Sequence, residues 1–163
     1  MPRTFCGDPE KASGRIAVVV SRYNETITQR LLDGALATLA AHGVPDQQID
    51  VAWVPGAWEL PVAANAMAAT ESYRAVICLG AVIRGETTHD QYINQQVSVS
   101  LGEISLRYQL PVLFGLLTCQ NLEQAIQRAG GRVGNKGSEC ALAALEMIDL
   151  MTQIGRGSTA VGL

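Results

Sequence analysis

Four apolar runs, each separated from the next by a segment with helical spacing, constrain the fold of this chain more than any other feature. They cover residues 15–21, 49–54, 75–83 and 112–118, and polar and apolar residues do not alternate within them. Strands covered on both faces have this pattern, whereas half-exposed strands alternate. The sequence therefore predicts an α/β fold, with a four-stranded parallel sheet, right-handed crossovers and helices on both faces.

The segments between these runs carry apolar residues at steps of three and four, as amphipathic helices do. Asn24 is suited to cap the first helix and Gly43 to stop it. A chain of this length without internal repeats fits one three-layer domain. We place helices at residues 24–43, 57–69, 90–108, 122–129 and 138–154, and the domain at residues 14–154, between a flexible leader (1–13) and a frayed tail (155–163).

Composition argues against several classes of partner. A formal net charge of −3 does not favour nucleic acid or an anionic membrane, because both need clustered Lys and Arg. No apolar run is long enough to span a membrane, and the polar N-terminal stretch does not look like a signal peptide. The cysteines, which are Cys6, Cys78, Cys119 and Cys140, are widely spaced without a C-x-x-C pair, so we expect reduced thiols in a cytoplasmic protein. Cys78 and Cys119 lie in strand-like apolar stretches, so we expect each to be a buried, small apolar residue.

Chemically versatile residues follow each apolar run. Because the carboxyl ends of parallel strands meet at one edge of a sheet, these residues are expected to gather there. They offer two aromatic faces (Tyr23 and Trp58), a carboxylate (Glu59), an arginine (Arg84) and a histidine (His89). This set suits a flat polar heterocycle and a phosphate. Simpler interpretations remain open for each residue: core or interface aromatics, a carboxylate that complements a helix dipole, a surface charge.

His89 is the strongest single candidate, since it follows a glycine-containing turn and histidine is the side chain best suited to moving protons in neutral solution. The other histidine, His42, is most simply a residue that complements the dipole at a helix end. A second cluster contains Arg128 and Lys136, which flank a glycine-rich loop. That loop is not a P-loop, no G-x-G-x-x-G follows the first strand, and neither a Ser–His–Asp motif nor a metal-ligand cluster is present.

Together these residues resemble the lumazine synthase family, over about residues 15–150. The motifs that carry the resemblance are Asn24 with Ile27 and Thr28, residues 54–61, Gly80 with residues 82–85, residues 87–89, Phe114 with Gly115, residues 123–130 and residues 134–137. The resemblance implies a flavodoxin-like fold. It also implies condensation of 5-amino-6-ribitylaminouracil with 3,4-dihydroxy-2-butanone 4-phosphate to 6,7-dimethyl-8-ribityllumazine, releasing phosphate and water, with no metal or organic cofactor.

The resemblance also implies roles for individual residues. Tyr23 would stack on the pyrimidine, and the ribityl chain and ring edge would be held by Ala57, Trp58 and Glu59. Backbone contacts to the uracil would come from Ala81, Val82 and Ile83. The phosphate would meet backbone N–H groups of Glu86 and Thr87, and His89 would transfer protons. The neighbouring subunit would supply Phe114 and Arg128, with Arg128 on the phosphate and Lys136 near the same anion.

Family members form pentamers, and some assemble twelve pentamers into a hollow icosahedral shell of sixty subunits. The short loop at residues 130–137 favours the shell slightly. Glu86 stands where the family often has small or neutral residues, so we expect its carboxylate to point away from the phosphate. Asp90 replaces a common aromatic. Two alternatives remain: a flavin- or lumazine-binding module that catalyses nothing, and a purely structural shell protein with a vestigial pocket.

Overall fold

The computed structural model of the chain describes the backbone of residues 1–161 and the side chains of residues 1–155. At its centre lies a parallel sheet in the order β2-β1-β3-β4. The strands are β1 (Ile16–Ser21), β2 (Ile49–Val54), β3 (Ala75–Ile83) and β4 (Val112–Cys119). Each lies within one residue of a predicted run, and the predicted α/β fold is confirmed.

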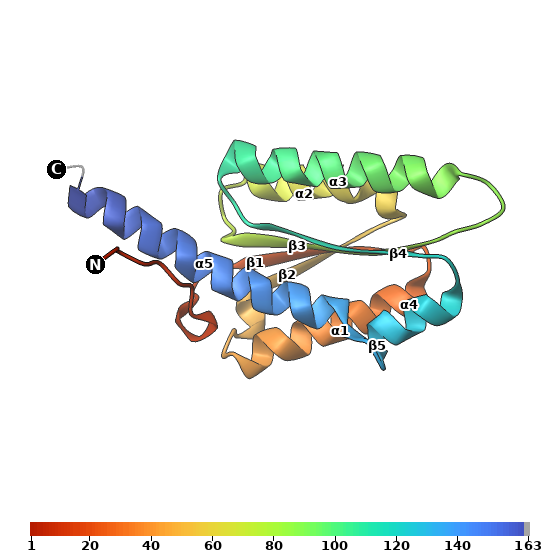
Figure 1. Ribbon diagram of the computed structural model, residues 1–163, viewed down its shortest axis with the longest axis horizontal. Helices are drawn as coiled ribbons and strands as arrows, with labels where there is room; N and C mark the ends of the chain where they lie inside the picture. Colours follow the sequence, from red (N-terminus) through yellow and green to blue (C-terminus); the bar gives the residue numbers. More distant parts are fainter. Residues whose placement is uncertain (162–163) are drawn as a thin grey trace.

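Helices cover both faces of the sheet and make a three-layer structure (Figure 1). One face carries α1 (Glu25–Ala41), α4 (Leu122–Arg128) and α5 (Lys136–Val161). The other carries α2 (Leu60–Ala69), which follows the short 3-10 helix η3 (Ala57–Glu59), and α3 (His89–Tyr108). Each crossover returns the chain to the start of the next strand, so the segments that follow the four strands all lie at the carboxyl edge of the sheet.

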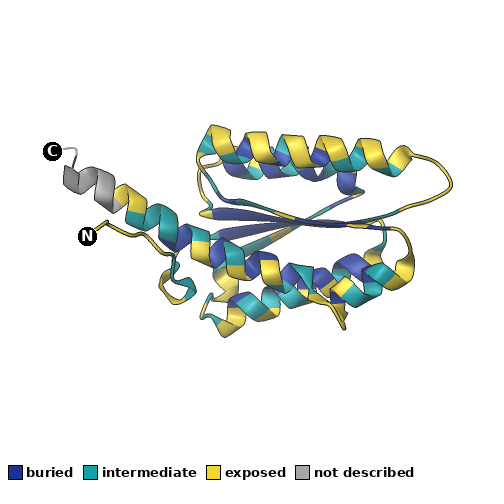
Figure 2. Cartoon of the chain, in the orientation of Figure 1, coloured by how far each residue is buried: buried dark blue, intermediate teal, exposed yellow. Residues whose placement is uncertain are grey.

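The two central strands, β1 and β3, are buried on both faces, which explains why polar and apolar residues do not alternate in them (Figure 2). Successive residues of β1 enter different cores: Val18 packs with Leu31 under α1, whereas Val19 packs with Leu60 under α2. Both valines are fully buried. A polar residue on either face would lose its water without gaining a partner, so these positions need apolar side chains.

Asn24 does not cap α1 as predicted. Its backbone is left-handed, with φ 63°, and its side chain makes no cap hydrogen bond. Asn tolerates this conformation better than most residues. The side-chain amide instead donates to the backbone oxygen of Ala81 in β3, at 2.9 Å. Asn24 therefore joins the end of β1 to the end of β3.

The glycine-rich loop and the last helix also differ from the prediction. A small antiparallel hairpin, β5 (Ala129–Gly131) with β6 (Gly134–Asn135), replaces an irregular loop. Helix α5 then begins at Lys136, because Asn135 Oδ1 accepts from the Ser138 N–H at 3.1 Å. The helix continues to Val161, so the frayed tail is not seen over residues 155–161; residues 162–163 lie outside the described part of the chain.

The predicted flexible leader lies beside α5 and is hydrogen-bonded to it (Figure 1). The Asp8 N–H donates to Asp149 Oδ2 at 2.8 Å, and Gln153 Nε2 donates to the backbone oxygen of Cys6 at 2.6 Å. A 3-10 turn at Pro9–Lys11 follows. These polar contacts carry no hydrophobic periodicity, which is why the sequence pattern did not predict them.

Candidate functional site

Backbone hydrogen bonds join the residues that follow β1 and β2 at the carboxyl edge of the sheet. The N–H groups of Arg22 and Tyr23 donate to the backbone oxygens of Val54 and Pro55, at 2.7 and 2.9 Å. Tyr23 and Trp58 remain 74% and 56% exposed within the chain. They are therefore not core aromatics, and their rings are open to a ligand or to another protein surface.

Glu59 has a local contact that explains part of its chemistry. Its Oε2 accepts from the Gly56 N–H at 3.0 Å, at the turn that leads into α2. The simpler interpretation, a carboxylate that stabilises a helix start, thus has direct support. A carboxylate accepts several hydrogen bonds, so Glu59 retains acceptor capacity for a ligand.

His89 is the first residue of α3, and it follows the exposed loop at residues 84–88. The backbone N–H of His89 donates to Thr87 Oγ1 at 3.3 Å, and His89 is exposed. The start of the loop is fixed to β4, because the Arg84 N–H donates to the backbone oxygen of Cys119 at 2.8 Å. Helix N-termini attract anions, so an imidazole and an anion-binding backbone lie together here.

Arg128 and Lys136 line a hollow of about 300 Å³ beside β4. The guanidinium Nη1 of Arg128 lies 3.7 Å from the sulfur of Cys119. Two cations in one small hollow favour an anionic ligand, although the carboxylate of Glu139 also faces it. The full lining is Leu116, Leu117, Thr118, Arg128, Val133, Gly134, Lys136 and Glu139. It includes none of Tyr23, Trp58 and His89.

Phe114 lies apart from both groups. It belongs to β4, the edge strand of the sheet, and pairs in register with Cys78, near the middle of the neighbouring strand β3. Its side chain is 41% exposed, which is unusual for a phenylalanine in a strand. Of the predicted site residues, Tyr23, Trp58, His89 and Arg128 thus lie near the carboxyl ends of the strands, whereas Phe114 lies in the middle of β4.

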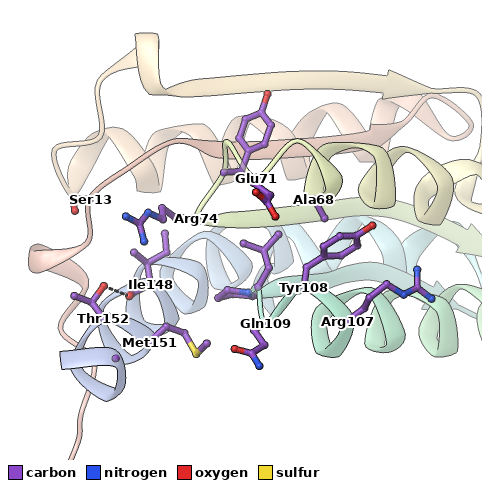
Figure 3. Close-up of a pocket in the computed structure, with 14 residues that line it drawn as sticks. Ser13, Ala68, Glu71, Arg74, Arg107, Tyr108, Gln109, Ile148, Met151 and Thr152 are labelled. Atoms are coloured by element: carbon purple, nitrogen blue, oxygen red, sulfur yellow. Dashed lines mark hydrogen bonds between the residues drawn. The ribbon is translucent and has the colours of Figure 1, made fainter. Parts of the chain in front are cut away.

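A larger open groove, of about 1250 Å³, lies at the opposite, amino edge of the sheet (Figure 3). In Figure 3, the groove is lined by Arg107 and Tyr108 at the end of α3 and by Ile148 and Met151 of α5. Arg74, which precedes β3, lies on the same side. The groove contains no residue of the predicted site. Because open parallel sheets bind ligands at the carboxyl ends of their strands, we assign the candidate site to the other edge.

Two groups of displaced pKa values belong to the fold. Hydrogen bonds from Tyr73 and Arg15, at 2.6 Å each, lower the pKa of Asp50 near the start of β2. Burial raises the pKa of the Cys78 thiol strongly, and raises that of Cys140 to about 11. The sequence predicted the first of these two thiols to be buried, as a small apolar residue.

Sequence reasoning missed two residues near the site. Asn24 was interpreted as a cap, yet it holds the backbone oxygen of Ala81, a group that the resemblance assigns to the uracil. Cys119 was interpreted only as a buried residue, which it is, at 3% exposure. No sequence signal indicates its contact with Arg128, because α4 brings the two together only in three dimensions.

The sheet order β2-β1-β3-β4, with helices on both faces, defines a flavodoxin-like α/β protein. Proteins of this class bind small ligands outside the carboxyl ends of their strands. A family model for 6,7-dimethyl-8-ribityllumazine synthase matches residues 13–152. The chain therefore belongs to this enzyme family of riboflavin biosynthesis, and the resemblance seen in the sequence is confirmed.

Two further features concern the described residues of the chain. None of their helices combines the length and the apolar character needed to cross a membrane. Within the same residues, no three His, Cys, Asp or Glu side chains lie together as the ligands of a metal ion would.

Proposed function

We propose that this chain catalyses the condensation of 5-amino-6-ribitylaminouracil with 3,4-dihydroxy-2-butanone 4-phosphate. The products are 6,7-dimethyl-8-ribityllumazine, inorganic phosphate and water. The reaction takes place in a site shared by two neighbouring copies of the chain. Membership of the family supports the pathway, and the arrangement of the candidate residues supports the shared site.

One copy supplies the carboxyl-edge residues. Tyr23 stacks on the pyrimidine, and the ribityl chain and ring edge are held by Ala57, Trp58 and Glu59. The uracil meets backbone groups of Ala81, Val82 and Ile83. The loop of Glu86 and Thr87 binds the phosphate through its N–H groups. The neighbouring copy supplies Phe114 and Arg128, with Lys136 near the same anion.

The chemistry asks for positioning and proton transfer. An amine of the uracil attacks the ketone and forms an imine with loss of water. Phosphate then leaves by elimination, the resulting enol becomes a ketone, and the second amine attacks that carbonyl and closes the ring with loss of a second water. His89 moves protons in these steps, a role worth typically about 10²–10⁴-fold in rate. Holding two reactants in one geometry supplies more, up to roughly 7–11 kcal/mol. We therefore expect proximity to outweigh acid–base catalysis.

The observation that carries the proposal is the exposure of the candidate side chains within one chain. Tyr23 and Trp58 at the carboxyl edge are 74% and 56% exposed, and the exposed Arg128 lies beside the end of β4. Phe114 is exposed on the outermost strand. A second copy whose β4 side faces the carboxyl edge of the first would bring these groups to one ligand.

The first experiment mixes both substrates with the purified protein and follows lumazine fluorescence beside phosphate release. The second tests the shared site by complementation between His89→Ala and Arg128→Ala. In rings reassembled from equal amounts of both variants, about a quarter of the shared sites combine an intact His89 with an intact Arg128. Turnover of the mixed rings should therefore exceed that of either variant alone.

The controls separate the competing functions. A wild-type protein that does not exceed the spontaneous rate, yet binds lumazine or flavin, would be a binding module, and one that binds neither would be a structural protein. If the wild type is active but the mixed rings gain nothing over their parents, the site lies within one copy. Reassembled rings of each single variant provide the matched baseline.

Assembly and location extend the same proposal. We propose a cytoplasmic homo-oligomer built from pentamers, and the short connection between α4 and α5 favours the icosahedral shell of sixty copies. Light scattering and electron microscopy of the purified protein distinguish an isolated pentamer from a shell. A stable monomer with full activity would contradict the shared site.

A further inference from the structure

We infer that Cys119 is a positioning residue for Arg128. Its buried sulfur accepts a hydrogen bond from the guanidinium and directs it into the hollow beside β4, where an anionic group of the substrate binds. The inference rests on the proposed function, because that function assigns the phosphorylated ketone to Arg128. It adds a determinant of how tightly that substrate is held.

The contact itself is the first support. Nη1 of Arg128 lies 3.7 Å from the Cys119 sulfur. In the described part of the chain, this sulfur is the guanidinium's one hydrogen-bond partner, and Arg128 forms no ion pair. An exposed arginine loses about 2 kcal/mol of side-chain conformational entropy when it is fixed in one rotamer. A partner that restricts it in the absence of ligand lowers the cost of binding.

The sulfur is held by rigid elements. Cys119 ends β4, where it pairs in register with Ile83, and its backbone oxygen accepts from the Arg84 N–H. Its side chain packs in the same buried cluster as Ala125, one helical turn before Arg128, and Ala129, the residue after it. Both ends of the contact are thus anchored in the core, as a precise binding group requires.

The chemistry of sulfur explains why this partner suits an anion site. A thiol is a weak, neutral acceptor, so it orients the guanidinium without neutralising its charge. A carboxylate in the same place would form an ion pair and compete with the phosphate for the same N–H groups. The cation therefore stays available to the ligand.

The test compares Cys119→Val with Cys119→Ser. Valine fills the volume of the sulfur with methyl groups and accepts no hydrogen bond, whereas serine keeps an acceptor. We expect Cys119→Val to raise KM for the phosphorylated ketone by roughly 3- to 10-fold. The kcat and the KM for the pyrimidine should change little, and Cys119→Ser should recover part of the loss.

The matched control is Cys140→Val, since Cys140 is a thiol of the same buried cluster that forms no hydrogen bond with an arginine in the described part of the chain. It should leave the KM for the phosphorylated ketone unchanged. A double-mutant cycle adds a readout that general destabilisation would not move. Once Arg128 is alanine, Cys119→Val should have no further effect on that KM.

The outcomes are distinct. If the wild type turns over and Cys119→Val keeps a normal KM, or adds its full effect to Arg128→Ala, the inference is wrong while the proposed function stands. If the wild type does not turn over, the proposed function fails. The affinity for inorganic phosphate, measured by calorimetry, then decides: a loss in Cys119→Val but not in Cys140→Val supports the inference, and equal affinities overturn it.

Discussion

Gly137 offers the sharpest test of how the structure positions the neighbouring Lys136, the second cation of the hollow beside β4. It is the second residue of α5, and a Cβ built on it would lie 1.9 Å from the backbone oxygen of Leu31 in α1. Carbon atoms pack comfortably at about 3.5 Å, so Gly137→Ala must separate the two helices by more than about 1 Å. No side-chain movement relieves the clash, because the obstacle is the main chain of α1.

The cost follows from that geometry. Overpacking a core typically costs about 1–3 kcal/mol, and a backbone clash of this depth belongs at the upper end. For a chain of this size, about 3 kcal/mol lowers Tm by roughly 6–12 °C. The shift also moves Lys136, the preceding residue, so we expect weaker use of the phosphorylated ketone.

The assay is thermal unfolding followed by circular dichroism, at matched protein concentrations because assembly affects Tm. The control is Gly102→Ala in the middle of α3, where an added Cβ meets no atom within 4 Å. Alanine is the better helix former by about 0.5–1 kcal/mol, so this variant should be slightly more stable. Equal Tm values for Gly137→Ala and the wild type would refute the reasoning, since the close approach of α1 and α5 would then not exist.

Three further predictions concern the site and the titrating groups. His89→Ala should slow turnover by no more than about 10²–10⁴-fold and leave measurable activity. Arg128→Ala should mainly raise KM for the phosphorylated ketone. Complete loss of activity in His89→Ala together with normal kinetics in Arg128→Ala would mean that acid–base catalysis outweighs substrate positioning. The lowered pKa of Asp50 adds stability that is present above its ordinary value of 3.8 and is lost as pH falls through the lower folded value, so Asp50→Asn should flatten the fall of Tm in acid; identical acid profiles would contradict it. The raised pKa of Cys140 means that the thiol ionises at lower pH in the unfolded chain than in the folded one. The free energy of unfolding should therefore fall as pH rises from 9.0 to about 11. Urea titrations at both pH values should show a smaller fall for Cys140→Ala.

The fold was predictable because its signals are local and strong. The unbroken apolar runs that became β1 and β3 require burial on both faces, and no other architecture gives four such strands with helices between them. What could not be predicted depends on contacts between distant residues. Asn24 looks like a cap in the sequence, yet the approach of β3 gives its amide a better partner in Ala81. The hydrogen bonds between Cys6 and Gln153 join residues at opposite ends of the chain.

The site shows the same division between local and distant information. Residues at strand ends, such as Tyr23 and Trp58, are placed by the rule that parallel strands share a carboxyl edge. Arg128 is different, because its position depends on the direction of a seven-residue helix and on the sulfur that holds its guanidinium. Sequence spacing specifies neither.

The open edge of β4 gives a physical reason why this fold and the proposed chemistry belong together. β4 pairs with β3 on one side only, and the ring of Phe114 in this strand is 41% exposed. An exposed strand edge with an apolar side chain favours association and is normally covered in a stable protein. Arg128 and Lys136, which the proposed function assigns to the phosphate, line the hollow beside the same strand. If a second copy covers β4 with its carboxyl edge, the same contact removes an aggregation-prone surface and completes the site, so association and catalysis should be lost together.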